Sequence, residues 1–482
     1  MKKINTCNDN IFALSTPVGG AIAVIRASGS GVLPVLSEIF SGRIEHRQLN
    51  YGKITDRIEP DGGQGEERKE NDAGALAVLD EAMAVYFRAP HSYTGEDMFE
   101  LNLHGSYSVI SAVSRALTRR GMRLAEAGEF TKRAFLNGKM DLVQADAVMD
   151  LINAETRRGA SAALEQLEGG LSRRIGAIEE KLLDFASELA AAMDYPEEME
   201  DEVLSAAPEV LNSAISRIRD LIDNGNCNKI IREGAKLAIL GRPNVGKSSL
   251  LNALMNAERA IVTNIAGTTR DVLEEKIDLL GLPVRIADTA GIHETGDAVE
   301  KIGIERALHE AASAECVLLL FDGSAGITQE DERLVQKVFG MNCRNVIFAI
   351  NKCDLSGCGT AAEQLKNIAP ENVGSISRIS CRTGFGLDEL KHRIAEAVGL
   401  SEGRAIVTNE RHIECLSAAC AELCEAAELF SKGGNAAEML LPQTELVAES
   451  VGNALHCLGE ISGREVSEEL LDRIFERFCV GK

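Results

Sequence analysis

A glycine-rich segment that ends in lysine and serine, Gly-Arg-Pro-Asn-Val-Gly-Lys-Ser at residues 241–248, has the residue types that bind phosphate groups. Gly241 and Gly246 allow the backbone to curl so that its N–H groups point at phosphate oxygens. Lys247 supplies positive charge for the β- and γ-phosphates, and Ser248 supplies a hydroxyl for Mg²⁺. The segment therefore predicts a nucleoside triphosphate site.

Further motifs follow in the order typical of guanine-nucleotide-binding proteins: Gly267–Asp271, Asp288–Gly291, Asn351–Asp354 and the base-contacting backbone of Ser380–Arg382. Asp354 can accept both N–H donors of guanine, which adenine lacks in that arrangement. Thr269 is expected to supply the second hydroxyl for Mg²⁺, and the Asp288 carboxylate can hold that ion through water. The motifs together predict a site specific for GTP.

The residue that orients the attacking water in Ras-like proteins, a glutamine after Asp-Thr-Ala-Gly, is absent, because Ile292 stands at that position. No arginine of the phosphate loop replaces it, since Arg242 precedes Pro243 and is expected to point outward. The side-chain oxygen of Asn244 can instead hold a monovalent cation against the phosphates. A fixed cation there would stabilise the charge that builds up during phosphoryl transfer.

The segment that carries these motifs alternates short apolar strands with helices over residues 234–398, which is typical of a parallel α/β sheet. Lys236–Leu240 is predicted to be a buried strand, with a helix opening at Ser249, which is the context that a phosphate loop requires. Two later motifs also follow predicted strands, Val284–Ala287 and Val346–Ile350.

Helical periodicity flanks this segment on both sides. One predicted helix face carries Leu171, Ile175, Ile178, Leu182, Phe185 and Leu189. Two later faces carry Val447, Val451, Ala454, Leu458 and Ile461, and then Leu470, Leu471, Ile474, Phe475 and Phe478. Pro196 and the acidic run Glu197–Glu202 are expected to interrupt the first helical region.

The chain is therefore predicted to be multidomain. Residues 1–125, with short β-rich runs, form an α+β domain, and 126–232 and 400–482 are two halves of an α-helical domain. A Ras-like α/β domain, residues 233–399, is inserted between those halves.

The composition, 45% hydrophobic and 26% charged over 482 residues, is ordinary for a globular protein. No apolar run suits a membrane span or a signal peptide, so a cytoplasmic location is expected. The 12 cysteines show no CxxC spacing, which implies neither disulfides nor metal sites.

The net charge of −23 argues against general electrostatic attraction to nucleic acid. A local basic surface for RNA is nevertheless possible, although a solvated helix face is the favoured reading of its members. These are Arg115, Arg119, Arg120, Arg123, Lys132, Arg133 and Lys139.

Nearly the whole chain resembles the MnmE (TrmE) family of tRNA wobble-uridine modification GTPases. Six segments outside the phosphate loop carry the resemblance: Ile22–Gly29, Ser92–Asp97, Gly128–Thr131, Arg133–Lys139, Asp141–Asp146 and the terminal Phe478–Lys482. His293 departs from the arginine that many members have after Asp-Thr-Ala-Gly.

The resemblance implies site residues that the sequence alone does not assign. A tetrahydrofolate derivative (5-formyl- or methylene-tetrahydrofolate) would contact Arg26, Glu100, Lys139 and Lys482. Potassium would be held by Asn244, Thr263, Ile265 and Thr268, and Mg²⁺ by Ser248 and Thr269. Glu300 would orient water, so that the catalytic residues are Glu300, Asn244 and Lys247.

The expected GTP contacts follow from the motifs and the resemblance together. They are Asn244, Val245, Gly246, Lys247, Ser248, Ser249, Thr263, Asn264, Ile265, Ala266, Gly267, Thr268, Thr269, Asp288, Thr289, Ala290, Gly291, Asn351, Lys352, Asp354, Ser380, Cys381 and Arg382. Cys479 is left open between a chemical role near the folate and a small buried residue that ends a helix.

The resemblance also implies partners. Members act as homodimers with an FAD-dependent partner, MnmG (GidA), which also uses NADH, in a heterotetramer or larger complex. The complex installs an aminomethyl or carboxymethylaminomethyl group at C5 of the wobble uridine of certain tRNAs, with folate as the one-carbon source. The alternative is a GTP-switched RNA- or ribosome-assembly factor without one-carbon chemistry, which would need neither a folate pocket nor the terminal Cys-Val-Gly-Lys.

Overall fold

The structure, a computed structural model, describes residues 9–57, 76–194, 196–257, 275–287, 308–341, 343, 345–368, 376–399, 407, 409–432 and 441–481. The chain divides into two compact units, Met1–Met149 with Ser462–Lys482 and Asp150–Ile461. The carboxyl-terminal segment thus belongs to the unit of the amino-terminal sheet. The predicted domain limits at residues 125, 232 and 399 stay a prediction.

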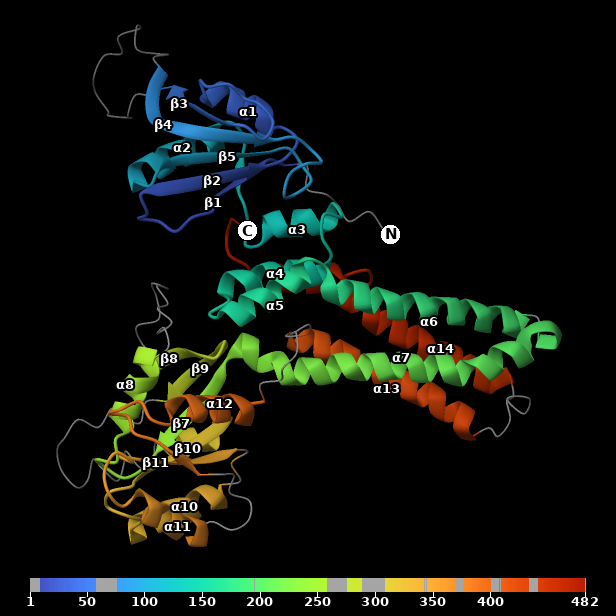
Figure 1. Cartoon of the computed structure of the whole chain (residues 1–482). Coiled ribbons are helices and arrows are strands. Elements are labelled where there is room, and N and C mark those ends of the chain that lie inside the picture. The colour runs from blue at the N-terminus through green and yellow to red at the C-terminus, as the bar shows by residue number, and fades with distance from the viewer. Residues whose placement is uncertain are drawn as a thin grey trace. The chain divides into compact units, whose positions relative to one another are not determined.

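Within the described residues, the first unit has a sheet in the order β3-β4-β5-β2-β1-β6 (Figure 1). Its strands are β1 (Ile11–Leu14), β2 (Ile22–Ser28), β3 (Leu49–Arg57), β4 (Leu76–Phe87), β5 (Met98–His104) and β6 (Arg123–Leu124). Neighbouring strands are antiparallel except β1 and β6, which are parallel. Helices α1 (Val32–Ile39) and α2 (Tyr107–Arg119) share one apolar core with the sheet. The α+β character predicted for this part of the chain is confirmed.

The same unit contains α3 (Glu129–Leu136), the start of α4 (Leu142–Asn153) and α15 (Glu468–Phe475). Leu142 and Ala145 of α4 form a buried cluster with Leu471, Phe475 and Phe478. Residues from the first and last thirds of the sequence thus share one core.

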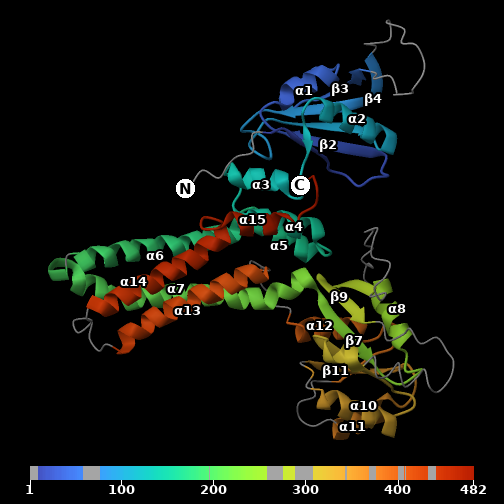
Figure 2. The ribbon, with the colours of Figure 1, turned by 180° about the vertical axis from the view of Figure 1, so that it is seen from behind.

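The second unit contains long helices that lie side by side in both views (Figures 1 and 2). They are α6 (Gly170–Asp194), α7 (Pro196–Glu233), α13 (Glu410–Lys432) and α14 (Leu441–Ser462), with the shorter α5 (Arg157–Leu167) packed against α6. The two predicted helix faces on α6 and α14 are confirmed, because all of their apolar residues are buried.

Two predictions about these helices need correction. The predicted break at Pro196 is confirmed, because α6 ends at Asp194 and α7 begins at Pro196. The acidic run itself does not interrupt the helical pattern, because α7 continues through it. Proline is well suited to a first helical position, where its missing N–H would be unpaired in any case. On the last predicted face, Leu471, Phe475 and Phe478 are buried, whereas Leu470 and Ile474 are only partly buried.

The α/β part of this unit is a sheet in the order β12-β11-β10-β7-β9-β8, parallel except where β8 meets β9. Its strands are β7 (Ala235–Leu240), β8 (Glu275–Leu279), β9 (Leu282–Ala287), β10 (Cys316–Asp322), β11 (Val346–Asn351) and β12 (Ser377–Arg378). The predicted strands before the motifs are confirmed as β7, β9 and β11.

Helices lie on both faces of this sheet, as parallel strands require. One apolar core involves α8 (Lys247–Ala257) and α12 (Leu387–Ala397), and the other involves α10 (Gln329–Gly340) and α11 (Cys358–Ile368). Helices α6 and α7 precede the sheet in the sequence, and α13 and α14 follow it. The α/β part is therefore inserted in a helical part, as predicted. Within the described residues, every helix is too short or too polar to cross a bilayer.

Candidate functional site

The phosphate loop joins the end of β7 to the start of α8, which opens at Lys247 rather than at the predicted Ser249. Gly246 has φ +103°, and a Cβ there would lie 2.3 Å from the Asn351 Nδ2 atom. A Cβ at Gly241 would lie 2.5 Å from the Leu320 carbonyl oxygen of β10. Both positions therefore require glycine, because the loop curls tightly against neighbouring strand ends.

Asn244 lies at the crest of this loop with φ +63°, a left-handed conformation that asparagine tolerates better than most residues. Its carbonyl oxygen accepts a hydrogen bond from Lys352 Nζ at 2.9 Å. Lys247 Nζ donates to the carbonyl oxygens of Gly241 (2.8 Å) and Arg242 (3.0 Å). The loop is thus preformed, with its lysine held beside the backbone that would face phosphate.

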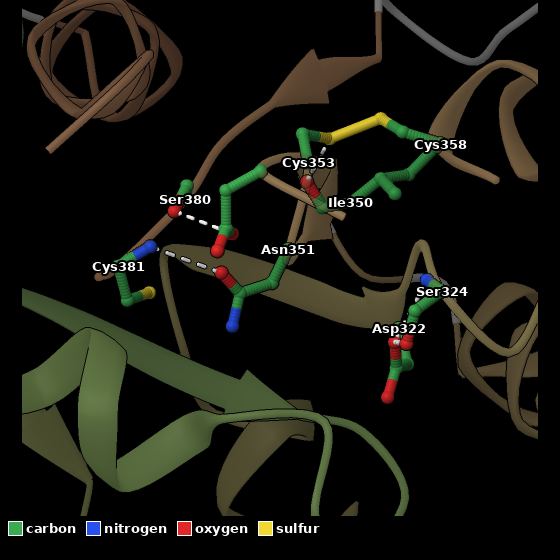
Figure 3. The surroundings of a disulfide bond; sticks show 9 residues. Asp322, Ser324, Ile350, Asn351, Cys353, Cys358, Ser380 and Cys381 are labelled. Atoms are coloured by element: carbon green, nitrogen blue, oxygen red, sulfur yellow. Dashed lines mark hydrogen bonds between the residues drawn. A yellow bond between two sulfur atoms is a disulfide. The ribbon is translucent and has the colours of Figure 1, made fainter. Parts of the chain in front are cut away.

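The base-reading motif follows β11 and is bonded to the phosphate loop. Asn351 Nδ2 donates to the Val245 carbonyl oxygen at 2.9 Å, while its Oδ1 accepts from the Cys381 backbone N–H at 3.1 Å (Figure 3). The Ser380 hydroxyl donates to Asp354 Oδ1 at 2.7 Å. One amide side chain therefore connects three motifs, and the Asp354 carboxylate is oriented by a fully buried serine.

These residues line one cavity of about 650 Å³, which we call the nucleotide pocket. Its lining residues are Asn244, Gly246, Lys247, Ser248, Ser249, Asn351, Lys352, Asp354, Leu355, Cys381 and Arg382. Ligand pockets usually measure about 300–1,000 Å³, so a nucleotide fits in size. The hydroxyl of Ser248, on the exposed first turn of α8, is of the type that Mg²⁺ prefers.

Asp322, at the end of β10, binds Lys352 of the pocket lining and was not predicted from the sequence. Its carboxylate accepts from Lys352 Nζ at 2.5 Å and from the Ser324 hydroxyl at 2.6 Å. Burial by itself raises the pKa of Asp322, but the bonds from Lys352 and Ser324 outweigh it and lower that pKa below its usual value. The signal available in the sequence was its place at the carboxyl end of an apolar strand, next to the other motifs.

Arg242 does not point outward as predicted. Its Nε donates to Asp331 Oδ1 at 2.8 Å, and the Asp331 side chain is fully buried at the start of α10. The same carboxylate caps the helix by accepting from Thr328 N–H at 3.0 Å. The pairing directs the guanidinium into the protein, so Arg242 braces the phosphate loop against α10.

The expectation of no disulfides is wrong for one pair. Cys353 of the base-reading motif is bonded to Cys358, the first residue of α11, with Cα atoms 5.3 Å apart (Figure 3). The turn between β11 and α11 brings the two together, and a five-residue separation carries no recognisable motif. Of the described free cysteines, Cys479 lies in the first unit and all others lie in the second.

Part of the predicted nucleotide site lies outside the described residues. These positions are Thr263, Asn264, Ile265, Ala266, Gly267, Thr268, Thr269, Asp288, Thr289, Ala290, Gly291 and Glu300, together with Ile292 and His293. The predicted roles of these residues in binding K⁺, Mg²⁺ and water stay predictions.

A second candidate site lies in the first unit, around Arg26 of β2. Its guanidinium pairs with Glu100 of β5 at 2.8 Å and donates to the Gly481 carbonyl oxygen at 3.4 Å. Arg26 also lies over the rings of Tyr93 (5.5 Å) and Phe130 (5.9 Å), a geometry that favours a cation. We call Arg26, Glu100 and Gly481 the tail site.

The terminal residues reach this site by pairing with the chain near α3. Val480 forms an antiparallel bridge with Ala127, and the Ser15 hydroxyl donates to the Gly481 carbonyl oxygen at 3.2 Å. Gly481 has φ +91°, and a Cβ there would lie 2.7 Å from the Leu14 carbonyl oxygen. The turn at Gly481 therefore requires glycine.

The remaining residues assigned to the folate lie differently. The exposed Lys139 donates through Nζ to the Pro90 carbonyl oxygen at 3.0 Å, and Lys482 is outside the described residues. Cys479 is exposed and follows the end of α15 at Phe475, so its reading as a small buried residue that ends a helix is wrong. The structure thus brings Arg26 and Glu100 together and places Lys139 against the loop around Pro90.

The basic residues considered for RNA are largely ion-paired. Arg119 and Arg120 pair with Asp56, Lys132 pairs with Asp472, and Arg123 pairs with Glu129. Because these charges are compensated within the unit, they do not form an open basic surface.

The most buried of these pairs joins Arg133 to Glu129 at 2.9 Å, with side-chain exposures of 7% and 8%. Arg133 also pairs with Glu96 at 3.0 Å and Asp9 at 2.9 Å. Burial by itself raises the pKa of Glu129, but hydrogen bonds from Arg123, the Glu126 N–H and Arg133 lower it overall. Glu96, Glu129 and Arg133 line a cavity of about 560 Å³ between α3 and α15.

Comparisons with known proteins cover nearly the whole chain. A family model described as the MnmE helical domain matches residues 142–479, and one described as the GTP-binding protein TrmE N-terminus matches residues 10–139. The tRNA modification GTPase MnmE of Lactobacillus delbrueckii subsp. bulgaricus is 39% identical over 487 residues, covering 98% of this chain and 98% of that protein. The proteins of that name from Aquifex aeolicus and Moorella thermoacetica are each 40% identical, covering 98% of this chain and 99% and 100% of theirs.

Proposed function

The chain belongs to the MnmE family of tRNA modification GTPases, and we propose that it uses GTP hydrolysis to drive modification of the wobble uridine of tRNA. It is a GTP hydrolase. The observation that carries the proposal is the nucleotide pocket, in which the phosphate loop, the Asn351–Asp354 motif and the Ser380–Arg382 segment line one cavity. The proposed product carries an aminomethyl or carboxymethylaminomethyl group at C5.

The proposed recognition of GTP divides between the two ends of the pocket. Asp354, held by Ser380, reads the guanine N1–H and 2-amino group. Lys247 and the loop backbone bind the β- and γ-phosphates, with the helix dipole of α8 adding to the attraction. Ser248 and Thr269 are the proposed Mg²⁺ ligands.

Hydrolysis is proposed to depend on potassium. When bound, this ion would supply positive charge near the β–γ bridge. The residues proposed to hold it are Asn244, Thr263, Ile265 and Thr268, and Glu300 is proposed to orient the attacking water. The left-handed backbone of Asn244 in the phosphate loop supports this assignment. Arg242 also supports it, because its ion pair with Asp331 prevents it from serving as an arginine finger.

The tail site is proposed to bind a tetrahydrofolate derivative, which would supply the one-carbon unit. Arg26 and Glu100 offer the cation and the hydrogen-bond acceptor that a glutamate tail and a pterin need, and the partly buried Tyr93 offers aromatic surface. Lys139, Lys482 and the exposed Cys479 are further proposed participants. The ordered approach of Gly481 to Arg26 supports a role for the carboxyl terminus.

The proposed assembly is a cytoplasmic homodimer that acts on tRNA with the FAD- and NADH-dependent MnmG protein, as a heterotetramer or larger complex. Nucleoside analysis of total tRNA from cells that lack this protein tests the proposal. We expect the C5-modified wobble uridine to be lost and to return with the wild-type gene. A normal level of that nucleoside in the deletion strain overturns the proposal and favours an RNA- or ribosome-assembly role.

A further inference from the structure

A disulfide lies at the base-reading end of the nucleotide pocket, and the proposed GTPase cycle gives it no role. Cys353 lies between Lys352 and Asp354 of the motif, and its sulfur is bonded to that of Cys358 (Figure 3). We propose that this cystine forms and breaks reversibly and that its oxidation tightens guanine-nucleotide binding. The inference rests on the proposed recognition of guanine by Asp354.

The bond closes the short loop that presents the base-reading carboxylate. Residues 354–357 lie between the two cysteines, and both Asp354 and Leu355 line the nucleotide pocket. Leu355 N–H donates to the Lys352 carbonyl oxygen at 2.9 Å, which makes the loop a tight turn. A covalent link across this turn therefore restricts the residue that selects the base.

The structure accommodates the reduced state as well. The Cys353 sulfur lies 3.3 Å from the Ile350 carbonyl oxygen, which can accept a bond from the free thiol. Cys358 is 9% exposed and packs with Ala361 and Leu365 in an apolar core, where a thiol behaves as a small apolar group. Reduction therefore leaves each sulfur in surroundings that suit a thiol.

The proposed oxidant is a low-molecular-weight disulfide. The partly buried Cys353, as thiolate, attacks one sulfur of that disulfide and releases one small thiolate, forming a mixed disulfide. The Cys358 thiolate then attacks the Cys353 sulfur and releases the second small thiolate. The protein loses two protons and two electrons, and the small disulfide becomes two thiols.

A further cysteine, which lines the nucleotide pocket, is disfavoured in this exchange. Cys381 also lines the cavity, but burial raises its pKa to about 11. Since the thiolate is the reacting form, Cys381 stays a thiol at neutral pH. The raised pKa of Cys381 therefore disfavours it as the attacking group in this exchange.

The direction of the effect follows from the oxidised geometry. With the cystine formed, Asp354 keeps its bond from Ser380, and Asn351 keeps its bonds to Val245 and Cys381. A cross-linked loop has less freedom to lose when the nucleotide binds, so oxidation should strengthen binding. We expect the Kd for GDP to fall by about three- to ten-fold on oxidation, the size expected for ordering one short loop.

The test uses the full chain, equilibrated with either oxidised glutathione or dithiothreitol. Thiol alkylation and peptide mass spectrometry report whether the Cys353–Cys358 peptide pair is linked, and fluorescent GDP titration reports affinity. We expect the linked pair and the tighter Kd only in the oxidised sample, with return on reduction.

The variants separate the cystine from general oxidation. Cys358→Ser should bind GDP equally in both conditions, at the affinity of the reduced wild type, whereas Cys343→Ser should keep the full response. The wild-type comparison decides the proposal even if Cys358→Ser does not fold. Equal Kd values in the two wild-type samples, with the link formed, overturn the switch. Failure to bind GDP in either state instead overturns the guanine-binding function itself.

Discussion

The nucleotide pocket and the tail site differ in how far apart their partners lie in the sequence. In the pocket, each motif is held by the strand directly before it, and the parallel strands β7, β10 and β11 bring their carboxyl ends to one edge of the sheet. In the tail site, Arg26 meets Gly481 across 455 positions of sequence. The pocket is therefore built from consecutive local units, whereas the tail site depends on the packing of the two chain ends. Changes in one should leave the other working.

Asn244→Ala tests the potassium assignment and should have the largest effect. We expect GTP hydrolysis in potassium chloride to fall by about 10²–10³-fold, because a stabiliser of transferring charge is lost. The faster turnover in potassium than in sodium should disappear, while binding of 5-formyl-tetrahydrofolate stays unchanged. Steady-state phosphate release in the two salts measures this.

Asn244→Gly is the matched control, because it removes the side-chain oxygen but suits the left-handed backbone at φ +63°. Both variants should lose the potassium response equally. If the wild-type protein hydrolyses GTP at one rate in both salts, the cation mechanism is wrong.

Asp354→Asn should change the preferred base. The amide cannot accept from both guanine N–H groups, so GTP binding should weaken by about 10²-fold, as expected for losing charged hydrogen bonds. Xanthosine triphosphate should gain affinity, because its 2-oxo group accepts from the new amide. Competition titrations with both nucleotides measure the switch, and a variant that still prefers GTP contradicts the assignment of Asp354.

Glu129→Gln tests the buried charges at the start of α3, in the same unit as the tail site. Replacing the carboxylate that pairs with Arg133 and Arg123 should lower the local stability around α3 by about 2 kcal/mol at pH 7, since hydrogen bonds to charged groups are lost. Hydrogen exchange of the α3 amides in the full chain measures this, and GTP binding should not change.

The same variant has a predicted pH signature. Because the folded-state pKa of Glu129 lies below its ordinary value of 4.5, its contribution is complete above that value and is lost as pH falls through the folded pKa. The advantage of wild type over Glu129→Gln should therefore shrink below about pH 4.5. An advantage that is constant down to pH 3 would contradict an ionised Glu129.

Gly481→Ala tests the tail site itself and should have the smallest effect. A Cβ 2.7 Å from the Leu14 carbonyl oxygen would displace the terminal turn from Arg26. We expect 5-formyl-tetrahydrofolate affinity to fall by about ten-fold, the size of one lost charged hydrogen bond. Calorimetry measures this.

Val480→Ala is its control, because the Val480 side chain is 57% exposed and only its backbone bridges Ala127. Removal of the last four residues should weaken folate binding at least as much as Gly481→Ala does. Equal folate affinity with and without those residues would show that the carboxyl terminus takes no part in folate binding. GTP hydrolysis that falls along with folate binding in Gly481→Ala would show that the two sites are not independent.

The sequence by itself determined the nucleotide-binding motifs, the strands before them and the buried faces of α6 and α14. Local sequence determines these features, because a strand end, a glycine-rich turn or a helical period is specified by a few neighbouring residues. Arg26 and Glu100, by contrast, were assigned only by the family resemblance, since nothing adjacent in sequence indicates their partners.

Only the tertiary structure decided which charges and thiols meet. Arg242 pairs with the buried Asp331, Arg133 pairs with Glu96 and Asp9, and Cys353 is bonded to Cys358 with 5.3 Å between Cα atoms. A charged side chain reads the same in the sequence whether it is solvated or paired. Whether it is paired depends on which groups the fold places within a few ångströms of it, because a charge that is removed from water needs a partner. That is why local patterns predicted the nucleotide pocket but not the bonds that brace it.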